Sequence, residues 1–129
     1  MFADTKAYSG FATDDLEKAQ EFYGGTLGLR TSVLVEGELL ALHLAGDRET
    51  LVYRKPDFTA ATYTILNFPV DDIDKAVDEL TARGVELERY EGFDQDEKGI
   101  VRGLGSGEGP DIAWFKDPAG NILSVLKEP

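Results

Sequence analysis

The sequence has no cysteine and only one histidine in 129 residues. The lack of cysteine excludes disulfides, zinc–thiolate sites and a cysteine nucleophile. The lone imidazole, His43, cannot hold a catalytic metal ion by itself. No apolar run is long enough to span a bilayer, and residues 1–10 lack the apolar core of a signal peptide. We therefore expect a cytoplasmic protein with no membrane partner.

Basic residues are also scarce, with 13 Lys and Arg against 25 Asp and Glu, for a formal net charge of -12. They are scattered and form no basic stripe. Nucleic acid is itself a polyanion and would be repelled by such a protein, so we expect no nucleic-acid partner. The acidity indicates either solubility or attraction of a cationic ligand, and charge alone does not decide between the two.

A repeat divides the chain into two similar halves. The sequence DDLEKA that begins at Asp14 recurs as DDIDKA beginning at Asp71. Each copy follows a strand-like run and opens a helix, because an Asp at a helix start caps free N–H groups and complements the helix dipole. Gly24-Gly25 and Gly84 then end the two helices.

Strand-like segments complete a β-α-β-β-β order in each half. We expect strands at residues 7–13, 29–35, 39–44 and 49–54, and in the second half at 61–70, 85–90, 111–115 and 122–126. With 42% hydrophobic residues the chain can bury a core. The sequence therefore predicts an α+β fold of two βαβββ modules, residues 1–57 and 58–129, within one compact domain.

One long, glycine-rich and charged stretch, residues 92–110, breaks this symmetry. A loop of this length in a compact domain is usually functional or mobile. It is either a mobile hairpin tip or a flap over a ligand, and the apolar pair Ile100-Val101 favours the flap.

Three motifs occur in a characteristic order: the helix opening at Asp15 with Phe22-Tyr23 and Leu27-Gly28, its echo at Asp72, and Asp117-Pro118-Ala119-Gly120-Asn121. In these motifs the sequence resembles the vicinal-oxygen-chelate superfamily of glyoxalase I, bleomycin-resistance proteins, fosfomycin-resistance enzymes and extradiol dioxygenases. The resemblance implies open, cup-shaped sheets, a cup completed by dimerisation, and therefore a homodimer. In the family's enzymes a divalent metal ion lies in the cup.

The resemblance also places the four metal ligands, and this chain departs from the pattern at each position. The positions correspond to Tyr8, Ile65, Ser124 and either Leu51 or Tyr53. Such metals prefer imidazole or carboxylate ligands. Glu49 shares the face of Leu51 but lacks partners, and is more typical of an exposed strand end. We therefore expect no metal and no other cofactor.

The sequence offers little for other catalysis. No Ser-His-Asp constellation can be placed, and no glycine-rich loop between a strand and a helix is present. His43 lies on a strand beside Leu42 and Leu44, so a structural role and an acid–base role both stay open.

Strand alternation gives the residues that would line the cup if the former metal positions face it. Trp114 is the preferred stacking residue, with ordinary packing against a helix as the alternative, and Arg102 lies on the flap. The candidate ligand-binding residues are Tyr8, His43, Tyr53, Tyr63, Ile65, Arg102, Trp114 and Ser124.

An aromatic cup suits a flat or amphipathic organic molecule. The chain in this respect looks like the metal-free bleomycin-resistance branch, whose members sequester a drug. We expect a small organic ligand, bound for drug or metabolite sequestration. The alternative is a metal-independent isomerase or lyase acting on a carbonyl compound, in which Tyr8, His43 or Arg102 would supply proton transfer or anion stabilisation.

Overall fold

The computed structural model describes Met1–Pro129, which divides into two compact units, Met1–Ala60 and Ala61–Pro129. Each unit carries one four-stranded sheet. None of the helices has the length and apolarity needed to cross a membrane.

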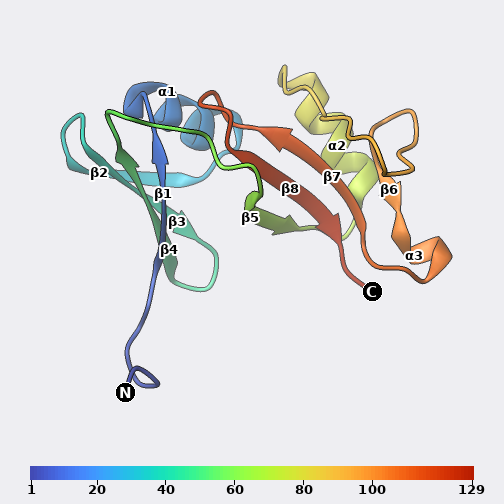
Figure 1. The fold of residues 1–129 in the computed structure, drawn as a ribbon, viewed down its shortest axis with the longest axis horizontal. Coiled ribbons are helices and arrows are strands. Elements are labelled where there is room, and N and C mark those ends of the chain that lie inside the picture. The colour runs from blue at the N-terminus through green and yellow to red at the C-terminus, as the bar shows by residue number, and fades with distance from the viewer. The chain divides into compact units, whose positions relative to one another are not determined.

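The first unit is a βαβββ module with a mixed sheet in the order β1-β4-β3-β2 (Figure 1). Its first strand pairs in parallel with its last, and the other neighbours are antiparallel. The elements are β1 (Ser9–Thr13), α1 (Leu16–Gln20), the π-helix η1 (Glu21–Thr26), β2 (Arg30–Val35), β3 (Leu39–Leu44) and β4 (Arg48–Arg54).

The first helix begins as the repeat predicts. The Asp15 carboxylate accepts a hydrogen bond from the Lys18 N–H at 3.1 Å. The chain continues directly into η1, which buries Tyr23 completely. The ring of Tyr23 lies 5.6 Å from that of Phe11 on β1, so Phe11 marks the face of the first sheet that the helix covers.

The second unit repeats the arrangement with the order β5-β8-β7-β6 and a parallel β5–β8 pair. The Asp72 carboxylate caps its helix at 3.0 Å from the Lys75 N–H. The elements are β5 (Thr64–Pro69), α2 (Ile73–Ala82), β6 (Val101–Arg102), α3 (Gly103–Ser106), β7 (Asp111–Lys116) and β8 (Ile122–Lys127). The α+β fold of paired βαβββ modules is confirmed.

The strand expected at residues 85–90 is wrong. This segment touches β7 through one bridge, Leu87 with Phe115, and one hydrogen bond from the Glu88 N–H to the Trp114 carbonyl at 2.8 Å. The Gln95 side chain accepts from the Tyr90 N–H at 2.8 Å and donates to the Glu88 carbonyl at 2.9 Å. Because these backbone groups are bonded to a side chain, the ladder stops, and β6 forms the edge of the sheet instead.

Residues 92–110 are folded rather than an open hairpin tip, and they contain β6 and α3. The Asp96 carboxylate accepts from the N–H groups of Lys98 and Ile100, each at 2.9 Å, and shapes the turn before β6. Ile100 is fully buried. Ile100 therefore anchors this segment in the core of the second unit.

The turn at Asp117 ties the last strand to the start of the unit. Asp117 accepts hydrogen bonds from the backbone of Ala119 at 3.0 Å and Asn121 at 2.9 Å. The buried Asn121 side chain in turn accepts from the Ala61 N–H at 3.1 Å. The motif that carries the sequence resemblance thus fixes the entry of the chain into this module.

Gly103 and Gly105, both in α3, provide a matched test of how closely α3 packs against Pro110. A Cβ on Gly103 would lie 2.4 Å from the Pro110 carbonyl oxygen, whereas one on Gly105 would meet nothing within 4 Å. We expect Gly103→Ala to lower the free energy of unfolding by about 1–3 kcal/mol, and Gly105→Ala to change it by less than about 0.5 kcal/mol. Denaturant titration measures both changes, and equal effects would contradict the close approach of Gly103 to Pro110.

Candidate functional site

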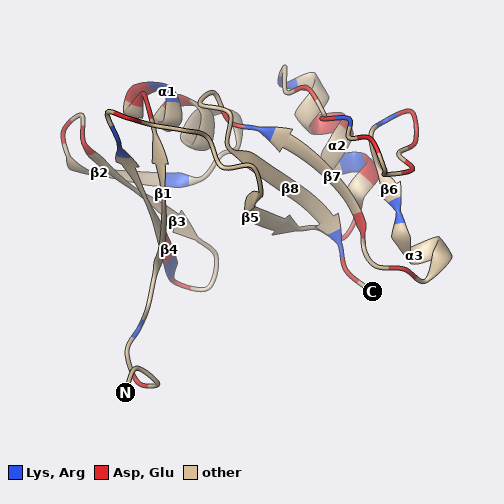
Figure 2. Ribbon diagram, viewed as in Figure 1, with Lys and Arg blue, Asp and Glu red and all other residues tan.

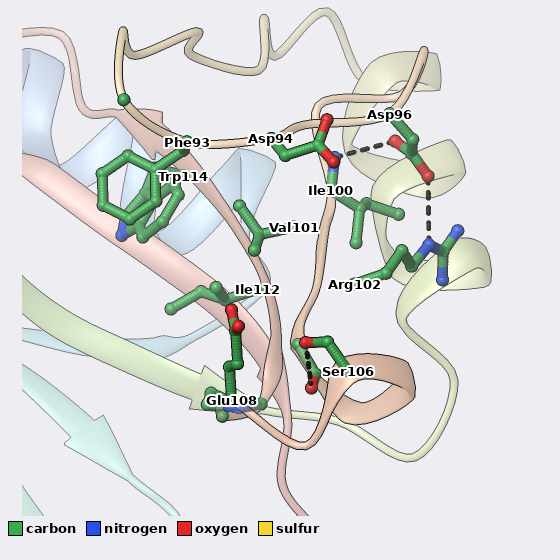
Figure 3. A pocket seen from close by; sticks show the side chains of 14 residues that line it. Phe93, Asp94, Asp96, Ile100, Val101, Arg102, Ser106, Glu108, Ile112 and Trp114 are labelled. Atoms are coloured by element: carbon green, nitrogen blue, oxygen red, sulfur yellow. Dashed lines mark hydrogen bonds and ion pairs between the residues drawn. The ribbon is translucent and has the colours of Figure 1, made fainter.

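An open hollow of about 850 Å³ lies in the second unit, between β6, β7 and residues 92–96 and 106–110 (Figure 3). Its apolar lining includes Val101, Ile112 and Trp114. Val101 and Ile112 are opposite one another in the β6–β7 ladder, so their side chains share a face of the sheet. Cavities of this volume accommodate small organic ligands.

This face is the one that α2 does not cover. Arg102 reaches Asp74 on α2, so it points to the helix side of the sheet. Residues alternate along a strand, and Val101 and Ile112 therefore point to the other side. Figure 3 shows the Arg102 side chain directed away from the aromatic rings of the hollow.

Two aromatic rings of the lining, Phe93 and Trp114, form one wall, and the Tyr90 ring packs beside Trp114. The Trp114 ring lies 5.0 Å from Phe93 at 53° and 5.6 Å from Tyr90 at 66°. Phe93 is 53% exposed, so part of its ring is accessible to a ligand. The wall is therefore an accessible stacking surface rather than a closed core.

Tyr90 supplies an unsatisfied polar group beside this wall. Its hydroxyl is buried and has no hydrogen-bond partner. Burial, with the nearby Glu88 carboxylate, raises the pKa of Tyr90. An orphaned buried hydroxyl costs free energy that a ligand or water contact would recover.

Two carboxylates at the rim of the hollow, Asp94 and Glu108, form no ion pair or hydrogen bond through their side chains. Both line the hollow, and Figure 3 shows the Glu108 carboxylate directed toward Ile112. The neighbouring cation Arg102 is already engaged, so it does not neutralise them. The rim therefore carries net negative charge.

Arg102 is held on the helix side by three carboxylates. Its guanidinium lies 2.7 Å from Asp74, 3.0 Å from Asp96 and 3.9 Å from Asp111. The hydrogen bond from Arg102 lowers the pKa of Asp74 to about 2. Burial raises the pKa of Asp96, but hydrogen bonds from the Ile100 N–H and from Arg102 outweigh it and hold that pKa below its ordinary value.

This cluster fastens the segment before β6 to α2. Lys98 extends it, with its ammonium 3.0 Å from Asp78 and 3.5 Å from Asp74. In Figure 2, α2, which carries acidic residues, lies beside β6 and the loop before it, both of which carry basic residues. The backbone that carries Phe93 and Asp94 is therefore anchored at its far end by ion pairs.

The eight candidate residues from the sequence divide between the units. Tyr8, His43 and Tyr53 belong to the first; the rest belong to the second. Trp114 and Arg102 both border the hollow. Tyr8 and Tyr63 are 71% and 70% exposed, whereas Ser124 is fully buried and donates a hydrogen bond to Asn67 at 2.5 Å. Their shared role as one ligand site stays a prediction.

Strict alternation fails at Ile65, because the β5–β8 register shifts between Thr64 and Leu66. Asn67, rather than Ile65, lies beside Ser124 in the ladder. Sequence reasoning also missed Phe93 and Glu108 as lining residues, since the segment that holds them has no periodic pattern. Its length and glycine content were the available signals.

The first unit brings together residues that the sequence analysis could not place as a set. The Ser32 hydroxyl lies 2.6 Å from Nε2 of His43, and Nδ1 of His43 lies 3.4 Å from the Glu49 carboxylate. The sequence alone allows no Ser-His-Asp constellation to be placed, and the three residues Ser32, His43 and Glu49 meet only through the register of three strands.

The residues do not fit the metal ion held by the family's enzymes. At the expected ligand positions, Tyr8, Ile65, Ser124 and Leu51 or Tyr53 provide hydroxyl and apolar groups without imidazole or carboxylate. No group of three or more His, Cys, Asp and Glu side chains is placed to hold a metal. Divalent transition metals favour the absent ligand types.

Two βαβββ units with one helix-free sheet face each define the class of this protein. Residues 7–125 match the model of the Glyoxalase/Bleomycin resistance protein/Dioxygenase superfamily, and the chain belongs to that family. No match is found among curated protein sequences.

Solved structures share the fold at low identity. A glyoxalase family protein from Enterococcus faecalis is 21% identical, with 98% of this chain and 99% of that one covered, at a TM-score of 0.65. TnmS3, an antibiotic binding protein from a Streptomyces species, is 22% identical, with 98% of each chain covered, at 0.66. A glyoxalase/dioxygenase from Nostoc punctiforme is 14% identical, with 98% and 92% covered, at 0.68.

The ion cluster predicts a defined pH dependence. Because Asp74 and Asp96 have lowered pKa values, pairing with Arg102 stabilises the fold above their ordinary pKa of 3.8, and this stabilisation is lost as the pH falls through the folded-state values, about 2 for Asp74. Arg102→Gln should therefore be less stable than the parent near neutral pH, and the difference should shrink below a pH of about 4.

Thermal unfolding between neutral pH and pH of about 2 measures this difference. Lys6→Gln removes the same charge from an exposed residue without an ion pair and serves as the control. A difference that stays constant over the whole range, or that the control reproduces, would contradict the role of the cluster.

Proposed function

We propose that this protein binds a small aromatic or amphipathic organic molecule, without a metal ion, and sequesters it in the cytoplasm. The observation that carries the proposal is the hollow with the Phe93–Trp114 wall and the unpaired carboxylates Asp94 and Glu108. Aromatic rings offer stacking area, and polar groups at the rim orient a ligand.

The free carboxylates favour a ligand that carries positive charge. A cation next to an aromatic face gains about 0.5–2 kcal/mol from the ring, and a carboxylate within reach adds a charge-assisted contact. The net charge of -12 would draw such a ligand toward the protein. Stacking with a cationic, planar molecule uses both features of the hollow.

Family membership and one structural relative agree with sequestration. TnmS3 is an antibiotic binding protein and has the same fold at 22% identity. The donor set at the expected metal positions supports a metal-free protein, because it lacks imidazole and carboxylate groups. A role for Arg102 in the isomerase or lyase alternative gains no support, since Arg102 is occupied by Asp74, Asp96 and Asp111.

A homodimer is part of the proposal. The edge strand β2 exposes three consecutive apolar residues, Val33, Leu34 and Val35, at 41%, 52% and 51%. Exposed apolar side chains on an open sheet edge favour association with another chain. The family resemblance supports a second copy of this chain as that partner.

Two dyes test the ligand class directly. Proflavine is a planar aromatic cation, and anilinonaphthalene sulfonate is an aromatic anion. We expect proflavine to bind more tightly, Glu108→Gln to weaken it about 3- to 10-fold, and Trp114→Leu to weaken it about 10-fold. Glu91→Gln, which removes the same charge from a residue outside the hollow, should leave binding unchanged. Isothermal titration calorimetry supplies the dissociation constants.

Proflavine affinity that is unchanged in Trp114→Leu would contradict binding at this hollow. Equal losses of proflavine affinity in Glu108→Gln and Glu91→Gln would mean that the net charge of the protein, and not the Glu108 carboxylate, attracts the cation.

Native mass spectrometry tests the metal and the dimer in one measurement. We expect the freshly purified protein to have the mass of a dimer, with or without an organic ligand and with no stoichiometric divalent ion. A monomer would contradict the proposed assembly. One Mn, Fe, Ni or Zn ion per site would contradict the metal-free proposal.

A further inference from the structure

Three polar side chains on adjacent strands of the first sheet form a continuous chain of contacts. Ser32 lies on β2, His43 on β3 and Glu49 on β4. The Ser32 hydroxyl is 2.6 Å from Nε2 of His43, and the Glu49 carboxylate is 3.4 Å from Nδ1 on the other side of the ring. Each ring nitrogen of the imidazole therefore has one partner.

Strand register produces this arrangement. His43 lies directly opposite Glu49 in the β3–β4 ladder, and Ser32 lies opposite Ala41, two residues before His43. Residues two apart on a strand point to the same face, so all three side chains share one face. Phe11 lies opposite Val52 on β4, and both side chains point to the face that the helix covers. Glu49 is three residues from Val52 on the same strand, so it points to the opposite face. The three residues thus lie on the open face.

The contacts favour the tautomer of His43 in which Nε2 can accept the proton of Ser32. The Glu49 carboxylate accepts only, so it favours a proton on Nδ1 of His43. Nε2 then carries a lone pair and accepts the hydrogen bond from the Ser32 hydroxyl. A nucleophile bonded to a base that a third group orients is the pattern of serine acyl transfer, on whatever fold it occurs.

An apolar group and a cation lie beside these residues. Ala41, opposite Ser32, is buried, and the next residue across the sheet, Leu51, is half-buried and shares its face. Arg30 lies opposite His43 on β2, and its guanidinium has no hydrogen bond or ion pair. An apolar acyl group would lie against Leu51, with Arg30 available to stabilise the negative charge that develops on its carbonyl oxygen.

We propose that Ser32, His43 and Glu49 form a second functional site, a nucleophilic centre that hydrolyses small carboxylic esters with apolar acyl groups. The Ser32 oxygen forms a bond to the acyl carbon while its proton passes to Nε2 of His43. The bond from that carbon to the leaving oxygen breaks, and the leaving group takes the proton from His43. Water then attacks the acyl-serine through the same base, and releases the carboxylic acid and free Ser32.

This site shares no residue with the hollow in the second unit, because all its residues belong to Met1–Ala60. The same sheet supplies an internal comparison. The Ser9 hydroxyl lies 2.8 Å from the hydroxyl of Thr50 and has no imidazole beside it. A serine that is bonded to another hydroxyl lacks a general base and should be inert.

A fluorophosphonate probe tests the nucleophile directly, since attack by an activated serine forms an O–P bond and expels fluoride. We expect a single adduct, located on Ser32 by peptide mapping, and no adduct in Ser32→Ala. His43→Gln should slow labelling about 10²- to 10⁴-fold. Ser9→Ala should label at the parent rate. Circular dichroism and the melting temperature show that each variant is folded.

Glu49 is a positioning residue, because it acts through His43. We expect Glu49→Gln to slow labelling by about 10-fold or more, and Glu49→Asp to restore part of the rate, while both leave the melting temperature nearly unchanged. Recovery with the shorter carboxylate separates orientation of the imidazole from a structural contact.

The reaction with p-nitrophenyl acetate gives a second measurement that does not depend on the His43 variant. The parent should release p-nitrophenol in a burst of about one equivalent per chain, and Ser32→Ala should show no burst. Adducts spread over several serines, equal labelling of the parent and His43→Gln, or an unchanged burst in Ser32→Ala would each overturn the proposal.

Discussion

The parallel pairing of the first and last strands closes both modules and determines where function can lie. Because β1 lies beside β4 and β5 beside β8, each helix is a crossover that covers one face of its sheet. The other face has no helix of its own module. The Ser32–His43–Glu49 contacts and the Trp114 hollow are both built on such faces. In each module the helix packs on one face of the sheet, and both proposed sites lie on the other face.

The sequence predicts the fold because its signals are local and occur twice. Asp15 and Asp72 cap their helices through the predicted contacts, and the turn at Asp117 has the side-chain bonds that its composition suggests. The strand at residues 85–90 fails because Gln95 captures the backbone groups of Glu88 and Tyr90, and no pattern of hydrophobicity reveals such a contact. Local propensity is reliable only where no side chain competes for the backbone.

The candidate sites depend on register, which the sequence determines only indirectly. Trp114 and Arg102 were placed at a cavity from strand parity and flap position, yet ion pairs turn the Arg102 side chain to the helix side. A bulge near Ile65 shifts the alternation, so Asn67 lies beside Ser124. Ser32, His43 and Glu49 meet only because two hairpins align them. The sequence predicts which residues of one strand share a face. It does not predict which residues of neighbouring strands lie opposite one another, because turns and bulges set that register.

The aromatic wall has a spectroscopic consequence. Trp114 is the only tryptophan in the chain, and its ring touches Phe93 and Tyr90 on the segment that leaves the sheet. The emission of the protein excited at the red edge of its absorption therefore comes from one known location. Quenching by acrylamide or a change of lifetime would follow the opening of this segment in real time, with no label attached to the protein.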